Sequence, residues 1–124
     1  MNEYLDITEF KARLNKFAEE RDWRQFHNPK NLAMATAVEA SELLEIFQWL
    51  TPEESESLGS LNREDERKVA VANEVSDIVM YCLRLCDILN INLQEALEAK
   101  FIENQKKYPP EKCRGSAAKY SSYK

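Results

Sequence analysis

Glycine and histidine are nearly absent from this sequence of 124 residues, which holds only two glycines, Gly59 and Gly115, and one histidine, His27. A Walker loop or a dinucleotide-binding fingerprint needs clustered glycines, because the backbone must approach phosphate closely, so the sequence excludes both. A single histidine excludes the HExxH zinc site and every cluster of two or more imidazoles. If the protein handles phosphates or metals, carboxylates and basic side chains must do it.

Excess positive charge, long apolar runs and paired cysteines are also missing. The formal charge of -5 and the pI of about 5.0 argue against binding to long nucleic acids, although a bound divalent cation would still admit a small anionic substrate. No apolar run approaches the roughly 20 residues that cross a bilayer, and the first ten residues lack a signal pattern, so we expect a cytoplasmic protein without a membrane partner. The three cysteines lack CxxC spacing, which predicts reduced thiols rather than disulfides or a zinc ribbon.

The sequence instead carries helix signals along its whole length. Sparse glycine and proline, 44% hydrophobic residues and no sustained period-two alternation predict an all-α protein. We expect a four-helix bundle that contributes to an oligomeric core, with helices at roughly 7–21, 29–50, 63–89 and 93–107.

Capping residues and composition set the expected boundaries. Expected N-caps are Asp6 or Thr8, Asn28 before Pro29, Thr51 before a short helical turn, and Asn92. Residues 1–110 are expected to form one domain. Residues 111–124 are expected to form a basic C-terminal tail, for which composition alone favours a solvated terminus.

Two pairs of acids occupy unusual positions in the second and third predicted helices. The second helix is apolar nearly all round, and Glu39 and Glu42 fall among its apolar side chains, whereas Glu45 lies on its narrow polar strip. Buried carboxylates need protons, basic partners or a cation. Glu74 and Asp77 repeat the spacing of three residues in the next long helix. Four carboxylates that converge without histidine or thiolate predict a site for a hard ion, Mg²⁺ or Mn²⁺.

Aromatic and polar side chains near these acids could bind a nucleotide. The rings that could sandwich a base belong to Trp23, Phe26, His27, Trp49 and Tyr81. Lys100, Asn104 and Tyr108 are spaced four apart and share one helix face that could contact phosphate and base. The simpler interpretation is that the rings are core residues or, for His27, a capping residue, and that the helix face is a solvated stripe.

The motifs FAEERDWRQFHNPKNLAMATAVEASELLEIFQW, EVSDIVMY, KFIENQKKYP and RGSAAKY resemble, in this order, the all-α nucleoside triphosphate pyrophosphohydrolases of the MazG type. The likeness is greatest to the dCTP pyrophosphatase branch and covers nearly the whole chain. The paired ExxE and ExxD elements of that family match Glu39 to Glu42 and Glu74 to Asp77. The connection between the two pairs is slightly longer than the family usually has.

The resemblance implies a fold, a reaction and roles for named residues. It implies Mg²⁺-dependent cleavage of a deoxynucleoside triphosphate, dCTP or a related one, between the α and β phosphates, in the service of nucleotide-pool sanitation. It implies a homo-oligomer built as a dimer of dimers. The four acids would bind Mg²⁺ and act in catalysis, with Glu42 as our choice to activate water, and the five rings would line the base and sugar pocket. Lys100 and Asn104, with Arg114 or Lys119 from the tail, would bind phosphate, and Tyr108 would be a further contact to the substrate.

Three other interpretations remain open at the level of sequence. A non-catalytic helical interaction module would use the acids in interhelical ion pairs and the rings in an oligomer core. A carboxylate-bridged di-iron bundle requires ExxH on two helices, and neither acid pair here has it. A relative that acts on a phosphoribosyl-linked nucleotide is opposed only by the resemblance of ERDWRQFH.

Overall fold

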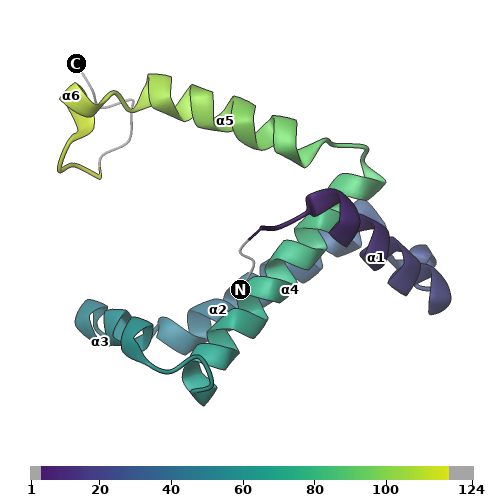
Figure 1. The fold of residues 1–124 in the computed structure, drawn as a ribbon, viewed down its shortest axis with the longest axis horizontal. Helices are drawn as coiled ribbons and strands as arrows, with labels where there is room; N and C mark the ends of the chain where they lie inside the picture. The colour runs from purple at the N-terminus through teal and green to yellow at the C-terminus, as the bar shows by residue number, and fades with distance from the viewer. Residues whose placement is uncertain (1–3, 118–124) are drawn as a thin grey trace. The chain divides into compact units, whose positions relative to one another are not determined.

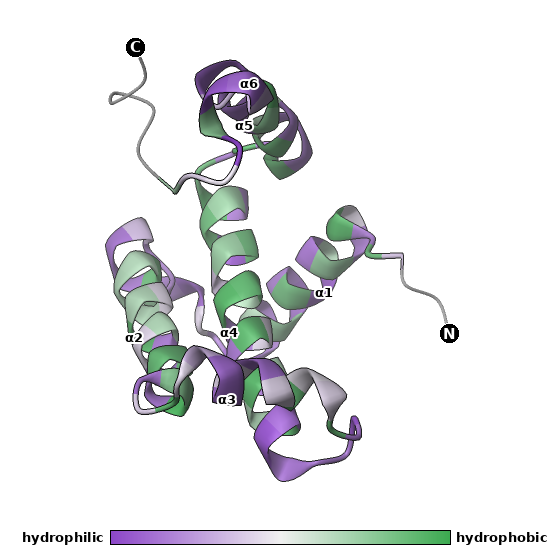
Figure 2. Cartoon of the chain, turned by 90° about the vertical axis from the view of Figure 1, so that its left-hand side faces the viewer, coloured by the Kyte–Doolittle hydropathy of each residue, from purple (hydrophilic) through white to green (hydrophobic). Residues whose placement is uncertain are grey.

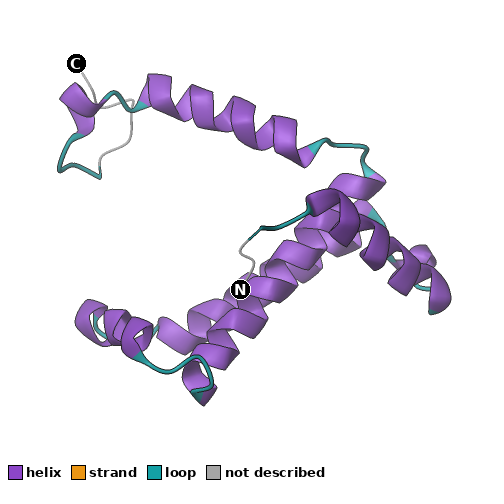
Figure 3. Ribbon diagram, in the orientation of Figure 1, coloured by secondary structure: helices purple, strands orange, loops and turns teal. Residues whose placement is uncertain are grey.

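The described part of the chain, residues 4–117 of a computed structural model, consists of helices and their connections (Figures 1 and 3). The elements are α1 (Ile7–Glu20), η1 (Arg24–Phe26), α2 (Pro29–Phe47), α3 (Pro52–Ser57), η2 (Leu58–Ser60), α4 (Glu66–Ile88), α5 (Leu93–Lys107) and α6 (Pro110–Cys113). The all-α prediction is therefore confirmed. Within these residues no helix is long and apolar enough to span a bilayer.

Side-chain caps start the helices at most of the expected places. The Asp6 carboxylate accepts a hydrogen bond from a backbone N–H in the first turn of α1 at 3.0 Å, and Asn28 does the same for α2 at 2.9 Å. Thr51 and Glu54 form a reciprocal capping box at α3. Asn92 caps α5. These groups satisfy backbone donors that the first helical turn leaves free.

Two predicted boundaries were wrong by three residues, and one short helix was not predicted. α2 ends at Phe47 rather than at 50, because the N–H of Leu50 bonds to the Phe47 carbonyl in a tight turn. α4 begins at Glu66 rather than at 63, because the Asp65 side chain provides the cap. Pro110 opens the single helical turn α6 within the expected tail.

α2 and α4 lie side by side and run in opposite directions (Figure 1). The segment before α2 therefore meets the end of α4, while the middles of the two helices face each other. α1 packs on the C-terminal half of α4. Leu32 of α2 and Leu83 of α4 are almost fully buried in this arrangement, and α4 is largely hydrophobic along its length (Figure 2). These helices bury each other's apolar faces and so bring distant residues together.

The chain divides after Asn90 into two compact units, and α5 and α6 belong to the second. Leu97, Phe101 and Ile102 are more than half exposed on α5. In the first unit, exposed apolar side chains of α2 include Val38 and Leu44, which an oligomeric core would cover. Packing of the 93–107 helix into a four-helix bundle, a domain over 1–110 and the oligomeric core itself remain predictions.

Candidate metal and nucleotide site

An acidic cluster forms where the middles of α2 and α4 face each other. Glu39 comes from α2, and Glu74 and Asp77 come from successive turns of α4. One carboxylate oxygen from each residue lies within 4.8 Å of the others, and all three side chains are half-buried. The spacing of three residues places both α4 acids on the face that α2 covers. Antiparallel packing of two helices thus turns a linear pattern into a compact set of oxygen ligands.

The cluster lacks protein partners for its charge. Oε2 of Glu39 and Oε2 of Glu74 are buried, and neither makes a hydrogen bond within residues 4–117. None of the ion pairs among the described residues involves Glu39, Glu74 or Asp77. Hydrogen bonding with Glu74 is the main reason that the pKa of Glu39 lies above its usual 4.5. Unpaired buried carboxylate oxygens are costly, and a hard divalent cation would satisfy them, so these residues fit Mg²⁺ or Mn²⁺.

Glu42 lies beside this cluster but differs from its members. Its side chain is exposed, and it is outside the group of three acids whose oxygens lie within 4.8 Å. Hydrogen bonding with Glu39 raises the pKa of Glu42 above its usual value. A solvent-accessible carboxylate with a raised pKa accepts a proton more readily than an ordinary glutamate. Its assignment as a fourth metal ligand remains a prediction.

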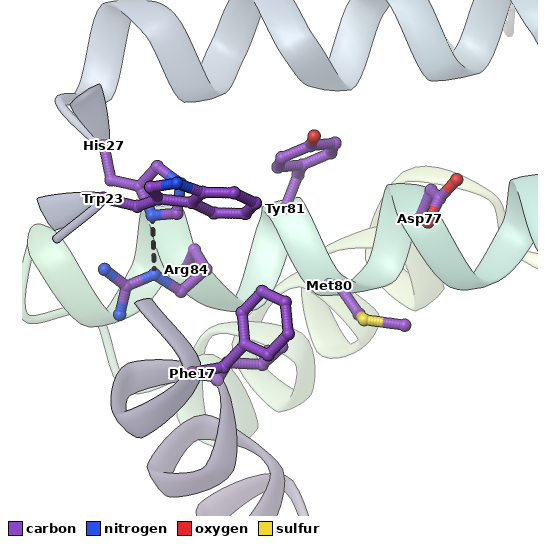
Figure 4. Close-up of a pocket in the computed structure, with 8 residues that line it drawn as sticks. Phe17, Trp23, His27, Asp77, Met80, Tyr81 and Arg84 are labelled. Atoms are coloured by element: carbon purple, nitrogen blue, oxygen red, sulfur yellow. Dashed lines mark hydrogen bonds between the residues drawn. The ribbon is translucent and has the colours of Figure 1, made fainter. Parts of the chain in front are cut away.

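A pocket of 230 Å³ adjoins the cluster, and Asp77 belongs to both (Figure 4). Its other lining residues are Leu14, Phe17, Trp23, His27, Met80, Tyr81 and Arg84. The rings of Phe17 and Trp23 meet edge to face with centroids 5.6 Å apart, and the rings of Trp23 and His27 meet at 6.3 Å. Apolar and aromatic walls beside a group of carboxylates suit a ligand with a flat ring at one end and metal-bound anionic groups at the other.

Tyr81 connects the pocket to the cluster electrostatically. Burial is the main cause that raises the pKa of its phenol, and the charges of Glu39, Asp77 and Glu42 raise it further. The hydroxyl therefore stays protonated around neutral pH. Tyr81 can donate a hydrogen bond next to the acids without adding a negative charge.

The structure brings together only part of the predicted nucleotide site. Trp23, His27 and Tyr81 line the pocket, and their contact with a nucleotide remains a prediction. Phe26 and Trp49 do not line it, and their side chains are 58% and 87% exposed. The remaining predicted contacts, Lys100, Asn104, Tyr108 and Arg114, belong to the second unit, and Lys119 lies outside the described residues. The roles of Phe26, Trp49 and these phosphate-binding candidates remain predictions.

Four residues of the pocket were missing from the predicted site. Leu14 and Phe17 carry the periodic signal of a core face, and Met80 carries no signal that separates it from the core. Arg84 had a usable signal, because it lies seven residues after Asp77 and three after Tyr81 and so shares their helix face. That face becomes a pocket wall only when α1 and the segment before α2 pack against α4.

Comparisons with known proteins show a family and several similar chains. Residues 34–122 match the model of the MazG-like family, and that range contains all four predicted acids. The chain is 41% identical over 106 residues to dCTP pyrophosphatase 1 of Bos taurus and 39% identical to that of Homo sapiens. Each match covers 86% of this chain and 61% of the relative, so the chain spans only part of their length. A pyrophosphatase structure from Archaeoglobus fulgidus superposes with a TM-score of 0.72 at 38% identity, covering 88% of this chain and 97% of that one.

Proposed function

The chain belongs to the MazG-like family, and from this premise we propose that it is a divalent-metal-dependent nucleoside triphosphate pyrophosphohydrolase. Its substrate is dCTP or a closely related deoxynucleotide, and its products are the monophosphate and pyrophosphate. The observation that carries the proposal is the adjacency of the unpaired acidic cluster and the aromatic pocket, which share Asp77. The similarity to dCTP pyrophosphatase 1 supports the choice of substrate.

The acids and the pocket have separate tasks in this reaction. Glu39, Glu74 and Asp77 hold Mg²⁺, with Mn²⁺ as a substitute, and Glu42 completes or flanks the site. Bound metal supplies charge neutralisation for phosphate oxygens as the anhydride bond breaks. Trp23 packs against the face or edge of the base. The pocket therefore fixes the nucleoside, so that the triphosphate extends toward the acids.

The bond that breaks is the α–β phosphoanhydride. A carboxylate oxygen of Glu42 takes a proton from water as the water oxygen bonds to one phosphorus of the anhydride, and the bridging oxygen leaves with the other phosphorus. The raised pKa of Glu42 makes it a stronger base than an ordinary glutamate. The proposed contacts to phosphate are Lys100 and Asn104, with Arg114 or Lys119, and Tyr108 is a further proposed contact to the substrate. A dimer of dimers in the cytoplasm is the proposed assembly.

A product-resolved substrate panel tests the proposal. The purified chain is incubated with each of the four deoxynucleoside triphosphates and Mg²⁺, and ³¹P NMR separates pyrophosphate from orthophosphate. We expect dCMP and pyrophosphate in equal amounts, fastest turnover with dCTP, and no reaction in EDTA. Release of orthophosphate alone would assign a phosphatase instead. No turnover with any nucleotide, together with no effect of divalent ions on stability, would favour the non-catalytic interaction module.

A further inference from the structure

Arg84 is the one charged residue buried within the described part of the chain, with only 4% of its surface exposed. Its Nε donates a hydrogen bond to Nδ1 of His27 at 3.2 Å, a contact between residues 57 positions apart (Figure 4). Its Nη1 donates to Oδ1 of Asn15 at 3.2 Å and lies 3.6 Å from Oδ2 of Asp87. The guanidinium is therefore held on two sides by α1 and α4 and directed at the single histidine.

This contact determines which nitrogen of His27 carries the proton. The Nε of an arginine always bears hydrogen and never accepts a hydrogen bond. Nδ1 of His27 must then offer its lone pair, so the neutral ring carries its hydrogen on Nε2. Burial, Arg84 and Arg24 all lower the pKa of His27, in that order, and so favour the neutral ring.

The other ring nitrogen is left for a ligand. Nε2 of His27 makes no hydrogen bond within residues 4–117 and is not among the fully buried unpartnered atoms, and His27 is one of the residues that line the pocket. The ring lies beside Trp23 in the same pocket wall. A donor placed next to a stacking surface can meet an acceptor on a flat heterocycle or its sugar.

We propose that Arg84 is a positioning residue for substrate recognition, which locks His27 in the form that presents Nε2–H to a hydrogen-bond acceptor of the bound nucleoside. The acceptor is a ring carbonyl, an unprotonated ring nitrogen or a sugar hydroxyl oxygen. The assignment of the ligand rests on the proposed function. The hydrogen bond by which Arg84 fixes the protonation of His27, called the lock below, is a property of the free protein.

Lysine cannot replace arginine in this role. A planar guanidinium uses Nε and Nη1 at once, so the contacts to Asn15 and Asp87 fix the direction of the Nε–H bond. Lys11 lies 3.8 Å from the same Asp87 carboxylate and adds to this support. An ammonium at position 84 would keep the charge and lose the fixed geometry.

The first test needs neither a variant nor a nucleotide. Because the sequence has a single histidine, a long-range ¹H–¹⁵N spectrum of the uniformly labelled chain reports on His27 alone. We expect the Nδ1 resonance at the position of an unprotonated imidazole nitrogen and Nε2 at that of a protonated one. A protonated Nδ1, or the averaged shifts of a free imidazole, would overturn the lock even if the enzyme is active.

Variants then separate orientation from charge. R84K and R84M should both lose the single tautomer, whereas R24Q should keep it. The side chain of Arg24 contributes charge to the His27 ring but no hydrogen bond, and the bond from the His27 N–H to the Arg24 backbone carbonyl does not depend on that side chain. An unchanged Nδ1 signal in folded R84K and R84M would overturn the proposal. Circular dichroism checks folding, and the spectrum of the unsubstituted chain decides the question if neither variant folds.

Kinetics test whether the lock serves recognition. Loss of one oriented hydrogen bond should lower kcat/KM for dCTP roughly tenfold in R84M, mainly through KM. In an H27A background, R84M should have little further effect, because Arg84 acts through His27. Equal losses in both backgrounds would overturn the recognition role. If no nucleotide is turned over at all, the proposed function fails while the NMR result on the lock still stands.

Discussion

The half-buried and buried charged side chains in the two halves of α4 have different surroundings. In the first half, Glu74 and Asp77 place like charges together opposite Glu39, and Oε2 of Glu74 is buried without a hydrogen-bond partner within residues 4–117. Two turns later, Arg84 is more deeply buried, and its Nε and Nη1 have partners from α1, from α4 and from the segment before α2, while its Nη2 makes no hydrogen bond within residues 4–117. Burial of a charge without partners destabilises a fold unless a ligand compensates, whereas a partnered charge can fix the geometry of its neighbours. We infer that the first half of α4 helps to bind a cation and that the second half positions the His27 ring.

Removal of a single cluster acid should have the largest effect. We expect E39Q or D77N to lower the rate of pyrophosphate release by a factor on the order of a hundred or more, because the metal loses a charged ligand. Helical content should be unchanged by circular dichroism. E45Q, on the same helix but outside the cluster, is the matched control and should keep normal turnover. Normal turnover in E39Q or D77N would remove the cluster from the mechanism.

Divalent ions should stabilise the protein more at high pH than at low pH. The pKa of Glu39 is raised in the fold, chiefly by hydrogen bonding with Glu74, so protonation of Glu39 favours the metal-free fold. The contribution of Glu39 to the free energy of unfolding is fully present below the ordinary glutamate pKa of 4.5. It is lost as the pH rises through the raised pKa of the folded state. Mg²⁺ replaces the lost proton, because it compensates the ionised cluster.

Thermal unfolding with Mg²⁺ or EDTA at about pH 5 and about pH 8 measures this difference. We expect a clear rise in Tm with Mg²⁺ at the higher pH and little change at the lower one. E39Q should reduce the effect of Mg²⁺ on Tm at both pH values. An equal shift at the two pH values would mean that Mg²⁺ binds elsewhere.

Loss of a stacking ring should affect binding more than chemistry. We expect W23A to raise KM for dCTP roughly tenfold with a small change in kcat, because stacking acts similarly in the ground and transition states. W49A, the same change at an 87% exposed site outside the pocket, should raise KM less. Steady-state kinetics measure both. An unchanged KM in W49A would remove Trp49 from the nucleotide site, and an unchanged KM in W23A would reassign the pocket.

Deletion of residues 111–124 should have the smallest effect. The deleted segment contains Arg114 and Lys119, which we propose to contact phosphate. We expect KM to rise about threefold to tenfold, because an exposed charge contact with phosphate contributes modestly. The free energy of unfolding of the first unit should not change. Unaltered KM and kcat would contradict a role for the tail at the site.

Sequence reasoning predicted the helices better than the site, for a physical reason. Capping residues such as Asn28 and Thr51 bond to a backbone N–H three residues later, so a short stretch of sequence is enough to predict them. Glu39 stood out because a carboxylate lay among apolar side chains, and the structure half-buries it with one oxygen unpartnered. Arginine is seldom fully buried, yet Arg84 is, because its burial depends on Asn15 and His27 far away in the chain.

By itself, the sequence determined that this protein is helical, where most of its helices begin, and that phosphate or metal chemistry had to rely on carboxylates and basic side chains. Those conclusions depend on residue types and on short-range periodicity. The sequence predicted that the two acid pairs converge, but the packing of the helices determined that Glu39, and not Glu42, joins Glu74 and Asp77 and that Arg84 reaches His27 across 57 residues. Such contacts depend on how α1, α2 and α4 pack, because packing sets the position of side chains that the chain itself leaves far apart.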